Sequence, residues 1–202
     1  MNKFLILAWL GPACLPLASQ AADAALLARA EEIVQGRCFI CHGANGESST
    51  PVFPRLAGQH SAYVSRQLAD FQSGRRRSAA MQPMVADLSA EDIKALGVFF
   101  EAQPVQAHPV ADAELAAQGR ALFDKGNKAS GVQACNACHG EQGQGTEELP
   151  RLAGQHALYL ETQLRSFSQR LRTNDNAVMH RIASRLTEAE VRALAAYLSG
   201  LR

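Results

Sequence analysis

The segment RCFICHGANGESSTPVFPRLAGQH (residues 37–60) returns later in the chain as ACNACHGEQGQGTEELPRLAGQH (residues 134–156). Each has Cys-x-x-Cys-His directly after its first residue and ends with PRLAGQH. The repeat extends beyond these segments, with offsets of 97, 96 and 98 residues at three pairs of positions: Cys38 and Cys135, Pro54 and Pro150, and Met81 and Met179. A small drift in offset is what short loop insertions produce, so most of the 202-residue chain consists of two copies of one unit.

Each copy is predicted to be all-α. Apolar residues recur at spacings of three and four in the segments ahead of both Cys motifs (24–36 and 112–126), as on one face of a helix. A second helix follows each PRLAGQH. A last helix opens with a capping box, Ser89-x-x-Asp92 in the first copy and Thr187-x-x-Glu190 in the second. No segment carries a convincing strand pattern.

The domain boundaries follow from composition. Residues 1–21 are laid out as a secretory signal peptide, with one Lys, an apolar stretch and small residues before a cleavage site after Ala21; an uncleaved anchor is the alternative. Domain 1 is predicted over 22–103 and domain 2 over 112–202, with the Pro-containing segment 104–111 as linker. Cys14 would leave with the signal peptide.

The four remaining cysteines all lie in the Cys-x-x-Cys-His motifs, which is the attachment signature of haem c. Two cysteines on one helical turn reach the two vinyl groups of the porphyrin, and the next residue, His, donates an imidazole to iron. Disulfides, a shared zinc ion and a thioredoxin-like pair are the alternatives. A zinc site normally needs closer pairs, and a thioredoxin-like pair needs a βαβ setting. We therefore expect two covalently bound haem c groups, through Cys38, Cys41, Cys135 and Cys138.

His42 and His139 are the expected fifth iron ligands. Methionine is the expected sixth ligand, because repeat register places Met81 and Met179 at matching positions. Met84, which aligns with Ile182, is the alternative in the first copy. His60 and His156 also repeat and would give bis-His ligation instead.

Together these segments resemble the dihaem class I cytochromes c of the c4 type. The resemblance rests on CFICHG, PRLAGQHSAYVSRQLADFQSG and MQPMVADLSAEDI with their second copies, and it covers nearly the whole chain after the signal peptide. It implies two tandem class I cytochrome c domains related by pseudo-twofold symmetry, each with His/Met iron. The sequence departs from the family pattern in the altered loop RRRSAAM before Met81 and in an insertion, NKASGV (127–132), ahead of the second Cys motif.

Three further sets of residues have two interpretations each. Arg55 and Arg151 are candidates to pair with haem propionates, since a buried carboxylate needs a cation, or are solvated loop residues. Tyr63 and Tyr159 are candidates to hydrogen-bond a propionate or are core residues. The basic run 75–77 would dock an acidic partner or form a solvated face.

The resemblance implies an electron carrier in the periplasm, often toward terminal oxidases, and the signal peptide also predicts export. We expect a membrane-bound oxidase or a quinol-oxidising complex as redox partner, and peripheral membrane association is compatible with this interpretation. The net charge of +1 gives no reason to expect nucleic acid binding. The alternatives are the dihaem subunit of a flavocytochrome c sulfide dehydrogenase and, as an enzyme, a dihaem peroxidase. Peroxidase chemistry needs an iron with an exchangeable position, which a methionine at each haem opposes.

Overall fold

The computed structural model describes residues 17–202, with side chains from residue 24 onward. Residues 1–16 of the predicted signal peptide lie outside the described part. Helix α1 begins at Leu17, so the expected cleavage site after Ala21 falls inside a helix. None of the described helices is long and apolar enough to cross a membrane.

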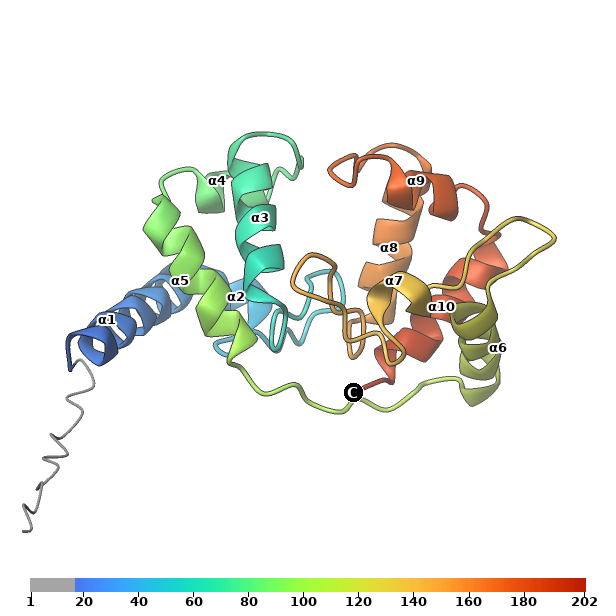
Figure 1. The fold of residues 1–202 in the computed structure, drawn as a ribbon, viewed down its shortest axis with the longest axis horizontal. Coiled ribbons are helices and arrows are strands. Elements are labelled where there is room, and N and C mark those ends of the chain that lie inside the picture. The colour runs from blue at the N-terminus through green and yellow to red at the C-terminus, as the bar shows by residue number, and fades with distance from the viewer. Residues whose placement is uncertain (1–16) are drawn as a thin grey trace, which may run out of the picture.

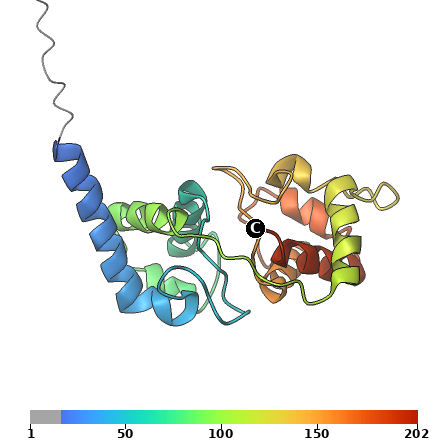
Figure 2. The ribbon, with the colours of Figure 1, turned by 90° about the horizontal axis from the view of Figure 1, so that it is seen from below.

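The described chain forms two all-helical domains that stand side by side (Figures 1 and 2). Domain 1 contains α1 (Leu17–Ile33), the π-helical turn η1 (Val34–Cys38), α2 (Phe39–His42), α3 (Ser61–Gln72), α4 (Met81–Val85) and α5 (Ala90–Glu101). Domain 2 contains α6 (Ala113–Lys125), α7 (Asn136–His139), α8 (Ala157–Ser168), α9 (Val178–Ala183) and α10 (Glu188–Ser199). The predicted all-α fold and its repeat are confirmed.

The last helix of each domain is fixed by its capping box. Ser89 Oγ accepts from the amide of Asp92, whose carboxylate accepts from the amide of Ser89, both at 3.0 Å. Thr187 and Glu190 repeat the arrangement at the start of α10. These reciprocal bonds satisfy amides that a helix end leaves without partners, so both predicted boxes are confirmed.

Each domain has its own core, in which the last helix packs against the first. In domain 1, α5 packs on α1 and α3, around buried Val34, Leu96 and Phe100. In domain 2, α10 packs on α6 and α8, around Phe123 and Leu194. Domains this small bury only a limited core, and a covalently bound group is one way in which a small domain gains stability.

The linker between α5 and α6 crosses the boundary of the two domains (Figure 2). Its Val105 lies against Gly58 of domain 1 and Gly154 of domain 2, the glycines of the two LAGQ turns. Both glycines have positive φ, 64° and 74°. A side chain there would be strained and would also meet Val105, so these turns need glycine.

Candidate functional site

Each Cys-x-x-Cys-His motif ends in a short helix that buries its histidine. His42 is 6% exposed and its Nδ1 donates to the carbonyl of Pro54 at 2.9 Å. His139 is 8% exposed and bonds the carbonyl of Pro150 at 3.2 Å. Burial lowers the pKa of both rings below 6.5. Both rings are therefore neutral with the proton on Nδ1, which leaves Nε2 with the lone pair that binds a metal.

The four cysteines are free thiols in two separate places. Cys38, Cys41 and Cys135 are partly buried and Cys138 is exposed. Burial raises the pKa of Cys135 to about 11 and raises that of Cys38 as well. The two pairs lie in different domains, whereas a zinc site would need them together. In the described part of the chain, no three His, Cys, Asp or Glu side chains converge as metal ligands.

The two methionines chosen by repeat register occupy matching places. Met81 begins α4 and packs against the core of domain 1, while Met84 in the same helix is 39% exposed. Met179 is partly buried in α9. Ile182, the counterpart of Met84, packs on the core of domain 2, so these two aligned residues differ in burial. The inward position of Met81 favours it over Met84 as a ligand.

The segment before Met179 is strained. Asn176 and Ala177 have φ of 52° and 62°, the left-handed region that residues with a Cβ rarely adopt. The carboxylate of Asp175 accepts from the amides of Ala177 and His180, at 3.2 and 3.0 Å. His180 Nδ1 bonds the carbonyl of Phe167 at 3.0 Å. These bonds hold the strained turn and fix the start of α9.

His60 and His156, the alternative iron ligands, lie at the domain boundary instead. His60 directly precedes α3, and His156 directly precedes α8. Nε2 of His60 bonds the carbonyl of Gln144 in domain 2, and Nε2 of His156 bonds the carbonyl of Ser48 in domain 1, both at 2.8 Å. Both rings thus use in domain contacts the nitrogen that bis-His ligation would need.

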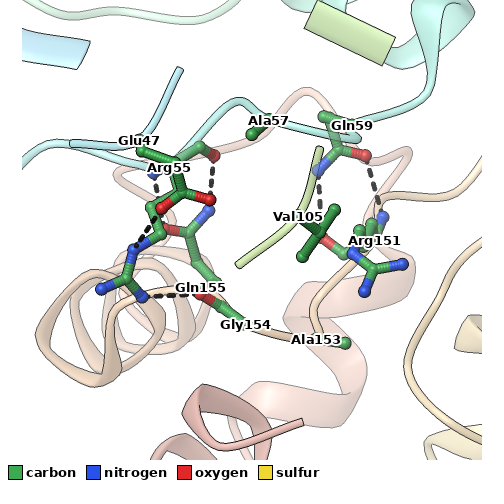
Figure 3. A pocket seen from close by; sticks show the side chains of 9 residues that line it. All are labelled: Glu47, Arg55, Ala57, Gln59, Val105, Arg151, Ala153, Gly154 and Gln155. Carbon is green, nitrogen blue, oxygen red and sulfur yellow. Dashed lines mark hydrogen bonds and ion pairs between the residues drawn. The ribbon is translucent and has the colours of Figure 1, made fainter. Parts of the chain in front are cut away.

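Arg55 and Arg151 also lie at the boundary, around a small cavity (Figure 3). Its volume of about 10 Å³ is close to what one water molecule needs. Arg55 donates to the carbonyl of Gly154 at 2.6 Å, and its Nε lies 3.3 Å from the carboxylate of Glu47. Gln144 stands at the position of Glu47 in the second copy, so Arg151 has no such carboxylate.

Burial lowers the pKa of both arginines, and Nε of each is buried without a hydrogen bond. An orphaned buried N–H is costly and indicates a missing acceptor. Arg151 is therefore the better candidate to pair with a propionate, because Glu47 already neutralises much of the charge of Arg55.

Two amide side chains join the domains reciprocally (Figure 3). Gln59 accepts from the amide of Arg151 at 2.9 Å and donates to its carbonyl at 3.0 Å. Gln155 does the same to the backbone of Arg55, at 2.8 and 2.9 Å. The pairs are related by the approximate twofold symmetry of the two domains, and both glutamines are buried.

Tyr63 and Tyr159 accept hydrogen bonds from arginines of the opposite domain. Arg172 donates to Tyr63 and Arg76 donates to Tyr159, both at 2.9 Å. The guanidinium carbon of each arginine lies over a phenylalanine ring of its own domain. Its distance to the ring centroid is 4.6 Å for Arg76 over Phe71 and 4.5 Å for Arg172 over Phe167.

The interpretation of 75–77 as a solvated face was wrong for Arg76, because the second domain covers it. The repeat could have revealed this role, since both arginines recur at an offset of 96.

The residues of both domains fit a haem c. Two neutral imidazoles are held by backbone carbonyls with Nε2 available, and two thiols precede each imidazole on one helical turn. Nε of Arg151 is buried without a hydrogen-bond acceptor. The methionine segments are partly buried against the same cores. Saturated His/Met ligation suits electron transfer, because it changes little in geometry with oxidation state.

Comparisons with known proteins agree with this arrangement. The family described as Cytochrome c matches residues 116–202, and the family described as Cytochrome C oxidase, cbb3-type, subunit III matches 25–99. Cytochrome c4 of Pseudomonas aeruginosa is 38% identical over the full length of both chains. The crystal structure of reduced recombinant cytochrome c4 from Pseudomonas stutzeri, 34% identical, has a TM-score of 0.83 over 87% of this chain and 98% of that chain.

A further relative is named for a different role. The thiosulfate dehydrogenase electron acceptor of Stutzerimonas stutzeri is 38% identical over 81% of this chain and 78% of its own length.

Proposed function

This chain belongs to the cytochrome c4 family, a family of dihaem c-type electron carriers, and on that premise we propose that it shuttles single electrons in the periplasm between respiratory redox partners, toward a terminal oxidase. Two covalent haem c groups are implied by its two cytochrome c domains and their Cys-x-x-Cys-His motifs. Each haem, when bound, supplies one iron that gains and loses one electron.

The protein's part is to hold each iron in one geometry. His42 and His139 would each supply a nitrogen to a haem iron, and Met81 and Met179 would each supply a sulfur. The carbonyls of Pro54 and Pro150 fix the tautomer and orientation of the imidazoles. The reciprocal bonds of Gln59 and Gln155 keep the two haem-binding domains in a fixed relation, which is what transfer between two centres requires.

The observation that carries this proposal is the duplicated buried histidine with Nδ1 on a backbone carbonyl and Nε2 available. The test is an absorption spectrum of the protein exported and matured in its host, with a pyridine haemochrome count. We expect two c-type haems and the weak red ferric band of methionine–iron bonding. The band should be halved in Met81→Ala and in Met179→Ala. A high-spin haem in the unmodified protein would overturn the ligand assignment.

The expected location and partners need their own experiments. A fusion of residues 1–21 to a reporter that is active only after export should be active, which would support the periplasmic assignment. Reduced protein added to membranes containing terminal oxidases should be reoxidised in an oxygen-dependent and salt-dependent manner. Lack of reoxidation would oppose the oxidase as acceptor while leaving the haem assignment untouched.

A second candidate role is acceptance of electrons from a thiosulfate-oxidising enzyme. The observation that favours it is the likeness to a protein named for that role in Stutzerimonas stutzeri. Reduction of the ferric protein by such an enzyme and thiosulfate, at a rate exceeding that with the enzyme omitted, would support it. The dihaem subunit of a flavocytochrome c sulfide dehydrogenase stays a hypothesis, for which co-purification with a flavoprotein is the test.

A further inference from the structure

An arginine in domain 1 ties the haem-attachment helix to the segment that carries Met81. Arg37, the residue before Cys38, makes two bonds to the carboxylate of Asp87, at 2.5 and 3.2 Å. It also donates to the carbonyl of Met84 at 3.4 Å. The hydrogen bond to Asp87 raises the pKa of Arg37, and the same bond lowers the pKa of Asp87. One side chain thus spans two parts of the domain that are 50 residues apart.

Domain 2 has an equivalent connection, but its arginine lies on the methionine side and not ahead of the cysteines. Repeat register places Arg185 at the position of Asp87, and Ala134 at the position of Arg37. An ion pair equivalent to that of domain 1 therefore cannot form in domain 2. Instead, Arg185 on the methionine side donates to the carbonyl of Gly131 at 2.8 Å. Gly131 lies in the insertion 127–132, which precedes the second Cys motif.

Local hydrogen bonds fix the conformation of the insertion and so the position of the Gly131 carbonyl. Its ends are joined by an antiparallel bridge between Asn127 and Val132, with bonds of 2.8 and 2.9 Å. The side chain of Asn127 donates to Glu190 at 2.8 Å, which anchors the loop to the start of α10. Gly131 has φ of 71°, a conformation that suits glycine. The loop projects from domain 2 between α6 and α7 (Figure 1).

These ties matter because the methionine helices are short. α4 has five residues and α9 has six, too few for a helix to be stable by itself. Their positions therefore depend on tertiary contacts, and segments with few such contacts open most readily. In both domains an arginine supplies a contact between the methionine segment and the chain just ahead of the haem-attachment cysteines.

We propose that Arg37 and Arg185 are positioning residues for Met81 and Met179, and that the insertion 127–132 takes over in domain 2 the task that the Arg37–Asp87 pair performs in domain 1. This inference rests on the proposed His/Met ligation. It concerns the lifetime of each methionine–iron bond, because an opened segment carries its sulfur away from the iron.

The test uses cyanide binding to the ferric dihaem protein. At high cyanide concentration, the binding rate is limited by departure of the methionine. Arg37→Ala should accelerate one kinetic phase by about fivefold at most, because the contribution of an ion pair with an exposed carboxylate is small. Arg185→Ala should accelerate the other phase. Met81→Ala and Met179→Ala assign the phases. A haem whose methionine has been replaced binds cyanide without the slow departure of that ligand, so its phase becomes fast.

A charge exchange separates positioning from general destabilisation. The double variant Arg37→Asp with Asp87→Arg keeps the pair with its charges reversed, and should return the rate to within about twofold of the original. Arg165→Ala is the matched control, since it removes ion pairs to Glu161 and Glu188 that do not reach α9. It should leave both phases unchanged.

Two results would overturn the proposal. One is unchanged cyanide kinetics in Arg37→Ala and Arg185→Ala. The other is equal acceleration of both phases by a single variant, which would indicate loosening of the whole molecule. A missing methionine–iron band in the unmodified protein would overturn the ligand assignment and this inference together, and the spectrum alone shows which case holds.

Discussion

The guanidinium of Arg172 in domain 2 donates a 2.9 Å hydrogen bond to the hydroxyl of Tyr63 in domain 1. The same guanidinium reaches Gln67 of domain 1 at 2.9 Å and Gln163 of its own domain at 2.8 Å. Arg172 is only 9% exposed. A charged group this buried contributes most through its hydrogen bonds. Its loss would remove the donor to the Tyr63 hydroxyl and to Asn174 Oδ1, whereas Gln67 and Gln163 would still accept from Arg76.

Arg172→Met should therefore weaken the contact between the domains. We expect a loss of about 2–3 kcal/mol in stability, because Met fills part of the space but cannot replace the charged donor to Tyr63 and Asn174. Arg76→Met, the matched change in domain 1, should cost less because Arg76 is less buried. Denaturant unfolding followed separately by haem absorption and by tyrosine fluorescence measures both. A larger loss for Arg76→Met would contradict the ranking.

The reciprocal glutamines offer a second test of the boundary. Gln59→Glu and Gln155→Glu keep the size and the acceptor oxygen, but an ionised carboxylate cannot donate to the carbonyls of Arg151 and Arg55. Each change should destabilise by about 1–3 kcal/mol and expose the linker. Limited proteolysis at 104–111 should accelerate at neutral pH. The exposed Gln133→Glu serves as control, and equal proteolysis of all three variants would rule out the assigned role.

A third prediction concerns the crossing of α6 and α10. A Cβ at Gly119 would collide with the carbonyl oxygen of Ala193, whereas a Cβ at Gly36 would meet nothing within 4 Å. Gly119→Ala should cost about 1–3 kcal/mol through overpacking. Gly36→Ala should be neutral or slightly stabilising, since alanine favours helical backbone. Thermal unfolding of the two variants measures this difference, and equal midpoints would show that α10 shifts freely.

The capping box of α5 predicts a pH dependence. Hydrogen bonds from Arg29, at 2.8 Å, and from the amide of Ser89 hold the pKa of Asp92 at about 2, below the ordinary 3.8. The ionised form is favoured in the folded state, so its stabilisation is fully present above about pH 4. It is lost as the pH falls toward about 2.

Asp92→Asn should thus destabilise domain 1 at pH 7 by about 1 kcal/mol, a discounted figure because Arg29 is half exposed. The stabilities of variant and parent should converge as the pH falls to about 2. Urea titrations across this range test the convergence. A gap of constant size at every pH would mean that the carboxylate charge contributes nothing.

Much of the molecule could be predicted from residue order alone. Local spacing of residues is enough to predict the repeat, the two Cys-x-x-Cys-His motifs, the helices and both capping boxes. Repeat register also singled out Met81, which the fold then placed against the core while Met84 faced solvent.

The roles at the domain boundary needed the tertiary structure. His60, Tyr63 and Arg76 find their partners in the other domain, some 80 to 110 residues away. No local pattern encodes which surface the second copy will cover. The twofold arrangement turned repeated surface residues into reciprocal bonds, and it made one guanidinium of a basic run part of a buried network.

The sequence by itself determined what each unit is, because covalent attachment sites, helix periodicity and caps are short-range features. Only the tertiary structure decided how the units act together and where they differ. Glu47 neutralises Arg55, whereas Gln144 leaves Arg151 without a carboxylate. In domain 1 the arginine that connects the two segments lies ahead of the cysteines (Arg37), and in domain 2 it lies on the methionine side (Arg185). Charge and hydrogen bonding act through space, so these differences between two similar copies arise only once the chain has folded.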